Sequence, residues 1–114
     1  MLHIEIRKLA ACLLIAPLSA NTLAKMANGL CDNLLTNIFR CWPFDDKDLV
    51  AKPVVVAPAM NTCMFEHPLT RRQLKQLGDF GVTVLDTQAK TLVCGDTGKG
   101  GMASVSSICE SIKL

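Results

Sequence analysis

The stretch PVVVAPAMNTCMF, residues 53–65, decides how this chain folds. Its first five residues are apolar and mostly β-branched, which is typical of a strand buried on both faces of a parallel sheet. The run ends in Pro58 and Ala59, so the residues that follow lie at the carboxyl end of the strand. Open α/β sheets bind their ligands at that end. We therefore expect a central strand over residues 53–57, followed by a segment that contacts a ligand.

Strands and helices alternate along the rest of the sequence. Good N-capping residues stand at 19–22, Pro43 stops a helix, and glycines separate the later elements. This order predicts one α/β domain over residues 1–114, with parallel strands and right-handed crossovers. The expected elements are a short helix at 4–11, a strand at 12–17, one helix from Ser19 to about Arg40, a charged loop at 44–52, the strand at 53–57, a helix from 68–70 to 78–81, a strand at 82–85, a glycine-rich loop at 95–101 and a helix at 105–113.

The composition excludes several classes of protein. The chain is half apolar but only 4% aromatic, and its 114 residues allow one domain with a modest core. The net charge is +2, and no Lys/Arg cluster alternates with aromatic residues, which disfavours a nucleic-acid surface. Six scattered cysteines without a CxxC pair argue against a structural zinc site and a disulfide framework. They indicate reduced thiols in a cytoplasmic protein.

The first twenty residues superficially resemble a secretory signal, with a charged start and an apolar run. An acidic residue, Glu5, lies beside Arg7 and Lys8, and Pro17 interrupts the apolar run. We prefer a helix followed by a strand. No apolar run reaches the roughly 18 residues that a membrane span needs.

Three strands are few for a doubly wound sheet, since sheets ordinarily have about five or six. The chain also begins close to His3, a residue that carries candidate chemistry. We expect that an N-terminal βαβ portion is absent from this polypeptide.

Five short blocks, in this order, resemble the phosphopantothenoylcysteine decarboxylases, which are flavin-dependent cysteine decarboxylases of coenzyme A synthesis. The blocks are HIEIR at 3–7, APLSANT at 16–22, CDNLLT at 31–36, PAMN at 58–61 and CGD at 94–96. Some positions depart from the family pattern. Phe65 replaces a Trp, residues 9–11 read Leu-Ala-Ala where the family has Trp-Ala-Asp, and the glycine-rich loop ends GGMAS. The strand and helix that contribute to flavin phosphate binding are missing.

The resemblance implies a flavodoxin-like (Rossmann-type) three-layer fold, truncated at its N-terminus, and a homotrimer with FMN between subunits. The implied substrate is 4'-phosphopantothenoylcysteine. Loss of carbon dioxide from a cysteinyl carboxyl group needs an electron sink. The family provides one by oxidising the thiol to a thioaldehyde with FMN, after which decarboxylation gives a stabilised enethiolate. Reduced flavin then returns the electrons, while the protein supplies orientation and protons.

The resemblance also assigns roles to residues. His3 would be the base that assists thiol oxidation, and Cys94 would protonate the enethiolate. Asn61 would bind the substrate carboxylate through its amide, with Met64 beside it. The residues assigned to FMN are Ser19, Ala20, Asn21, Thr22 and Ala59. Lys99 and its neighbouring glycines suggest a flap over the substrate.

Each of these residues also has a plain structural interpretation. His3 could be a surface residue near a terminus, Ser19 a helix cap, and Asn61 a turn cap. Met64 could fill the core, and Cys94 could be a small buried apolar residue. His67 matches no catalytic position, and we interpret it as a polar residue at a helix entry.

Two other functions compete with the enzyme. One is a non-catalytic regulator similar to the yeast halotolerance proteins, which inhibit a protein phosphatase. Those regulators tend to have long acidic tails and to lack a catalytic residue. The other is a truncated chain that binds no flavin. Flavin colour separates the enzyme from the truncated chain, and turnover of the phosphopantothenoyl substrate separates it from the regulator.

Overall fold

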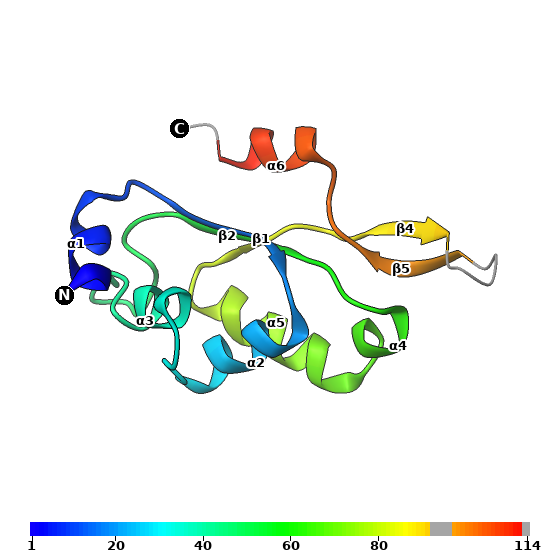
Figure 1. The fold of residues 1–114 in the computed structure, drawn as a ribbon, viewed down its shortest axis with the longest axis horizontal. Helices are drawn as coiled ribbons and strands as arrows, with labels where there is room; N and C mark the ends of the chain where they lie inside the picture. Colours follow the sequence, from blue (N-terminus) through cyan, green and yellow to red (C-terminus); the bar gives the residue numbers. More distant parts are fainter. Residues whose placement is uncertain (92–96, 113–114) are drawn as a thin grey trace.

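The computed structural model describes residues 1–91 and 97–112 of the chain. Three parallel strands form a sheet in the order β1-β2-β3, as Figure 1 shows. All five residues of the central strand are buried, in agreement with the apolar run from which that strand was predicted. The strands are β1 (Leu13–Leu18), β2 (Val54–Pro58) and β3 (Thr83–Val84).

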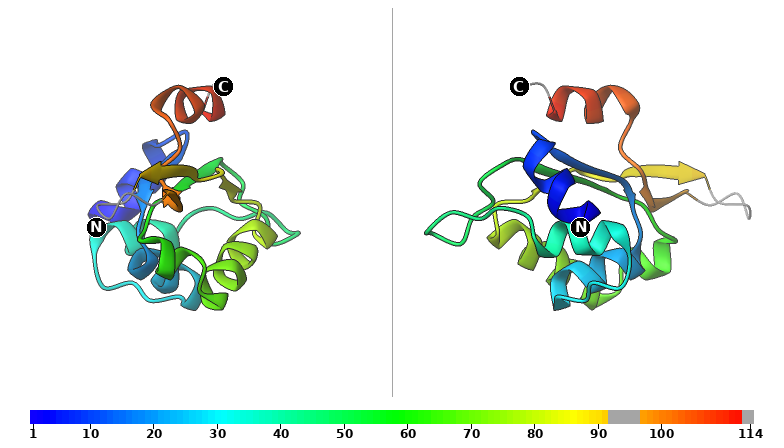
Figure 2. Two further views of the ribbon diagram at one scale, coloured as in Figure 1. Left: turned by 90° about the vertical axis from the view of Figure 1, so that its right-hand side faces the viewer. Right: turned by 60° about the vertical axis from the view of Figure 1, so that its left-hand side comes forward.

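Helices cover the two faces of the sheet unequally (Figures 1 and 2). One face carries α2 (Ala20–Asn28), α3 (Leu34–Arg40) and α5 (Pro68–Asp79), and the main core lies beneath them, with Leu18, Leu23 and Leu77 fully buried. The other face carries α6 (Val105–Ser111), which contributes Ile108 to a small cluster with Ala57 and Ala103. The three layers agree with the predicted fold class.

Contacts from distant parts of the chain hold α1 (Leu2–Leu9) at the amino end of β1. Lys52 Nζ donates to the carbonyl oxygens of Arg7 and Ala10, at 2.7 and 2.9 Å, where the end of the helix leaves carbonyl groups unpaired. Arg7 Nε donates to the carbonyl of Cys41, and the Cys41 thiol donates to the carbonyl of His3. The predicted short helix is therefore present and is fixed next to α3.

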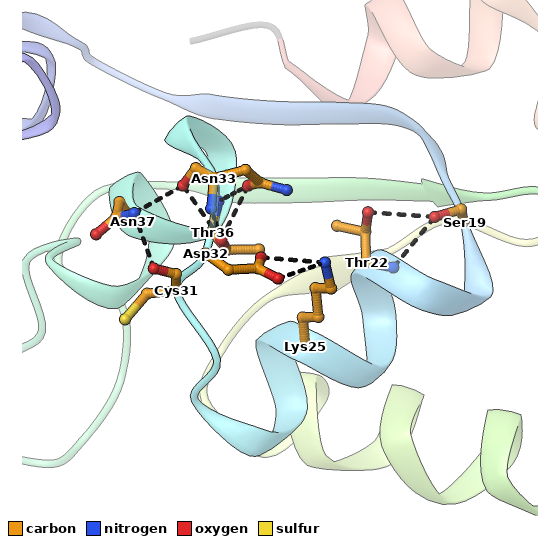
Figure 3. A network of polar contacts seen from close by, with 8 residues as sticks. All are labelled: Ser19, Thr22, Lys25, Cys31, Asp32, Asn33, Thr36 and Asn37. Carbon is orange, nitrogen blue, oxygen red and sulfur yellow. Dashed lines mark hydrogen bonds and ion pairs between the residues drawn. The ribbon is translucent and has the colours of Figure 1, made fainter.

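The prediction of one helix from Ser19 to Arg40 is wrong, because the chain turns sharply between α2 and α3. Gly29 ends α2 in the left-handed conformation, at φ +75°, which glycine adopts without steric cost. Asn33 then begins α3 with a capping box, in which its Oδ1 accepts from the Thr36 N–H and Thr36 Oγ1 accepts from the Asn33 N–H. Figure 3 shows this network with the ion pair between Lys25 and Asp32, at 2.8 Å. That pair lowers the pKa of the Asp32 carboxyl, mainly through the hydrogen bond from Lys25.

The glycine-rich segment also differs from the prediction. Instead of a loop at 95–101, β5 (Thr97–Gly101) pairs antiparallel with β4 (Gln88–Thr91). Gln88 Nε2 donates to the Met102 carbonyl at 2.8 Å and closes the base of this hairpin. Backbone pairing between the strands overrides the weak strand preference of glycine.

Candidate functional site

The ends of β1 and β2 bring two of the predicted site segments together. These strands are neighbours, and the N–H of Ala59, just after β2, donates to the carbonyl of Leu18, the last residue of β1, at 3.0 Å. The segments after the two strands, 19–22 and 59–64, therefore begin side by side. Both lie at the carboxyl edge of the sheet, where α/β folds bind ligands.

The segment after β1 opens α2 with a polar cap. Ser19 is the N-cap, and its Oγ accepts from the Thr22 N–H at 3.1 Å and donates to Thr22 Oγ1 at 3.2 Å. Asn21 is exposed and Ala20 is half-buried, and the first turn of α2 has no acidic side chain. The structural interpretation of Ser19 as a cap is confirmed. The same hydroxyls and first-turn N–H groups remain at the surface, where they suit a polar ligand.

The segment after β2 orients the amide of Asn61. This residue is the N-cap of α4 (Thr62–Phe65), a short helix that was not predicted, and its side-chain oxygen accepts from the Cys63 N–H at 2.8 Å. A backbone N–H can only donate, so the atom facing it must be the amide oxygen. The exposed Asn61 therefore offers its two side-chain N–H groups to a ligand acceptor. The turn-cap interpretation and the ligand role are compatible.

A cavity of about 350 Å³ joins the start of α2 to α4 and α5. Met64 at its wall is 51% exposed, so the interpretation of Met64 as core filler is wrong. Met60, in contrast, is buried next to Thr70. The cavity is lined by Ala20, Ala24, Cys63, Met64, His67, Leu69, Thr70 and Gln73.

His67 is a helix-entry residue, as predicted. It is the N-cap of α5, and its Nδ1 accepts from the Leu69 N–H at 3.1 Å.

His3 lies far from the other candidate residues. It sits in the first turn of α1 at the amino end of β1, whereas Asn61 follows the carboxyl end of β2. A strand of β1's length spans about 20 Å, and Figure 1 places α1 and α4 at opposite ends of the molecule. One chain by itself therefore does not bring His3 together with Asn61.

Cys94 lies outside the described residues. The hairpin that flanks it is tied to the site, however, because the Met60 N–H donates to the Gly100 carbonyl at 2.9 Å. Sequence reasoning missed this contact. The signal that could have found it is a row of glycines, since strands with glycine often allow another backbone to approach closely.

In residues 1–91 and 97–112, no three His, Cys, Asp or Glu side chains are grouped so as to hold a metal ion. Among the helices of the same residues, none is both long and apolar enough to cross a membrane.

Comparison with known proteins places the whole chain in one family. The family model described as Flavoprotein matches residues 1–114. A probable phosphopantothenoylcysteine decarboxylase of Arabidopsis thaliana is 51% identical over 114 residues, which are 100% of this chain and 54% of that protein. The phosphopantothenoylcysteine decarboxylase of Mus musculus is 48% identical over 113 residues, or 99% of this chain and 52% of that protein. The chain thus spans about half the length of these curated relatives.

Solved structures agree with this placement. A PPC decarboxylase mutant complexed with pantothenoylaminoethenethiol matches with a TM-score of 0.88 and 51% identity, over 98% of this chain and 58% of that chain. The FMN binding protein AtHal3 matches with a TM-score of 0.85, over 98% of this chain and 57% of that chain. The parallel sheet and its helices therefore have the flavodoxin-like arrangement of PPC decarboxylase. By family model, by sequence identity and by fold, this chain belongs to the Flavoprotein family.

Proposed function

We propose that this chain takes part in the FMN-dependent decarboxylation of 4'-phosphopantothenoylcysteine to 4'-phosphopantetheine, a step of coenzyme A biosynthesis. The observation that carries the proposal is the orientation of Asn61. Its amide oxygen is held by the Cys63 N–H, which leaves the N–H groups of the exposed side chain for a ligand, on a segment that begins beside the one that opens α2. Amide N–H groups suit a carboxylate acceptor, which is the group that this reaction removes.

The described residues fit part of a flavin site. Small side chains at Ala20 and Ala59 limit steric crowding at the strand ends, and Ser19 and Thr22 place hydroxyl groups beside them. Asn21 adds an exposed amide in the first turn of α2. When bound there, FMN would supply the two-electron redox chemistry that makes the loss of carbon dioxide possible.

The remaining residues would hold the substrate or transfer a proton. Asn61 would hold the substrate carboxylate through its amide N–H groups, and the flexible thioether of Met64 would pack against the apolar part of the substrate. His3 would accept the proton of the substrate thiol. Cys94, which precedes β5 in the sequence, would donate a proton to the enethiolate carbon at the end of the reaction.

The separation of His3 from Asn61 supports a shared site. If both residues serve one reaction, His3 must come from one chain and Asn61 from another. A homotrimer in which each site lies between two subunits meets this requirement, because a ring of head-to-tail contacts closes on itself. In such an assembly α1 of one subunit approaches the carboxyl edge of the sheet in the next.

We place the protein in the cytoplasm. The described cysteines Cys12, Cys31, Cys41, Cys63 and Cys109 are all free thiols, which suits a reducing compartment.

Reconstitution tests the proposal directly. The purified chain is incubated with FMN and desalted, and bound flavin is measured by its visible absorbance. The substrate is then added, and carbon dioxide and 4'-phosphopantetheine are quantified. We expect retained flavin and both products. Flavin without turnover would favour the phosphatase-regulator alternative, and a colourless protein would favour a truncated chain that binds no flavin.

A further inference from the structure

The base of the β4–β5 hairpin touches the peptide bond that leads into Asn61. Gly100 is buried, and its carbonyl accepts from the Met60 N–H at 2.9 Å. A Cβ atom built on Gly100 would lie 2.3 Å from the Met60 carbonyl oxygen and 3.5 Å from Phe65 Cβ. The shorter of these distances is far below van der Waals contact, and the atom that it meets belongs to the backbone.

The backbone conformation at this position also requires glycine. Gly100 has φ +116°, a value that residues with side chains rarely adopt. Gly29 shares the positive φ but has no collision, since a Cβ atom there would make only an ordinary contact with Arg40 Nε at 3.9 Å. The two glycines therefore separate the effect of backbone strain from the effect of collision with Met60.

Met60 cannot easily move away from such a collision. Its side chain is 8% exposed, and its sulfur lies 3.7 Å from Thr70 Oγ1. The same hydroxyl donates to the Met64 carbonyl at 2.6 Å, so Thr70 ties the residues on both sides of Asn61 together. With the Met60 side chain held, displacing the Met60 carbonyl would rotate the peptide bond that joins Met60 to Asn61.

We propose that Gly100 is a positioning residue for substrate recognition. Because Gly100 lacks a side chain, the hairpin packs directly on the backbone of Met60. This contact sets the direction of the Asn61 side-chain amide. The inference rests on the proposed role of Asn61 in binding the substrate carboxylate. It adds that Gly100 contributes to the preference of the site for a ligand that carries the carboxylate over one that lacks it.

The test compares Gly100→Ala with Gly29→Ala, a matched substitution at a positive φ without a backbone collision. The affinity of the FMN-loaded chain is measured for 4'-phosphopantothenoylcysteine and for 4'-phosphopantetheine, which lacks only the carboxylate. We expect Gly100→Ala to weaken binding of the substrate at least about tenfold, the effect of one lost charge-assisted hydrogen bond. Binding of 4'-phosphopantetheine should change less than about twofold on the same scale. Gly29→Ala should change neither affinity.

Two outcomes would overturn the proposal. Equal weakening of both ligands would make Gly100 a purely structural residue, and unchanged substrate affinity would remove it from recognition. Failure of the proposed function looks different, because wild-type chain would then bind the two ligands equally well. In that case the Asn61 side-chain amide resonance still reports on positioning. It should shift in Gly100→Ala and not in Gly29→Ala, and an unshifted resonance would contradict the contact.

A second measurement covers the case in which Gly100→Ala does not fold. Wild-type protein labelled with ¹⁵N is titrated with each ligand in turn. The Gly100 and Met60 amide resonances should shift with the substrate and stay in place with 4'-phosphopantetheine. Equal shifts with both ligands would show that the hairpin does not sense the carboxylate, and the proposal would fall.

Discussion

The two ends of the sheet are built in different ways. At the carboxyl edge, Ser19 and Asn61 accept hydrogen bonds from residues two or three positions further along the chain, and both stay exposed. At the amino end, α1 is held by Lys52 and Cys41, which are more than thirty positions away in the sequence. Local caps orient single exposed side chains, whereas long-range bonds fix a whole helix. His3 is therefore placed by tertiary contacts, at a distance from the edge where its proposed chemistry takes place.

The largest expected effect concerns His3, the proposed base at the amino end. His3→Asn keeps a polar side chain but removes the base, and general base catalysis contributes about 10²–10⁴-fold to rate. We expect a loss of turnover of that size, with the flavin staying oxidised after substrate is added. Stopped-flow absorbance measures this directly. Rapid bleaching in the variant would remove His3 from the oxidative half of the reaction.

Cys94→Ser should stop the reaction at a different point. A Ser hydroxyl is a far weaker acid than a thiol, so the final protonation should fail by a comparable factor of about 10²–10⁴. Thiol oxidation and decarboxylation do not need this proton. We expect carbon dioxide without 4'-phosphopantetheine, detected by coupled gas measurement and mass spectrometry. Normal product formation would mean that Cys94 only fills space.

Mixing two inactive variants tests whether the two ends of the sheet meet between subunits. His3→Asn and Asn61→Asp chains are unfolded together in equal amounts, refolded and assayed. In a cyclic trimer with sites between subunits, roughly a quarter of the sites would combine an intact His3 with an intact Asn61. Activity should return to about that fraction of wild type. Sites contained within single chains would return none, and a stable monomer in sedimentation would exclude the assembly.

A smaller effect is expected from Asn61→Asp at the carboxyl edge. Asp is as good an N-cap as Asn, so the bond from the Cys63 N–H and the stability of the fold should persist. Loss of the amide donor costs about 1.5–3 kcal/mol of binding free energy, and repulsion between carboxylates adds to that. Calorimetry should show substrate affinity falling at least about tenfold with normal flavin content. Undiminished affinity would exclude Asn61 from the site.

The smallest effect is expected at Lys52, which anchors α1. Lys52→Met keeps the apolar stem but removes the donor to the Arg7 and Ala10 carbonyls. We expect a loss of about 1–2 kcal/mol in the free energy of unfolding, measured by chemical denaturation. Hydrogen exchange should accelerate in α1 more than in α2. Uniform acceleration would mean that Lys52 supports the whole core instead of the amino end alone.

Local patterns in the sequence were sufficient to predict much of the fold. The β-branched run at 54–57 predicted the central strand, and Ser19 predicted a capped helix start. The segment after β2 was predicted to leave the sheet at its carboxyl end, and it does so. These features depend on residues within a few positions of one another, so the sequence by itself determines them.

Other features were decided only by the tertiary structure. The turn at Gly29 is an exception, because its signals, a glycine and the Asn33 capping box, are local, and one helix was nevertheless predicted across it. The glycines at 98–101 indicate a flexible loop, but pairing with β4 and contact with Met60 make them a strand. The distance between His3 and Asn61 follows from α1 packing on α3 and Lys52. The last two outcomes depend on groups that are distant in sequence, and a pattern along the chain cannot show which distant groups will meet.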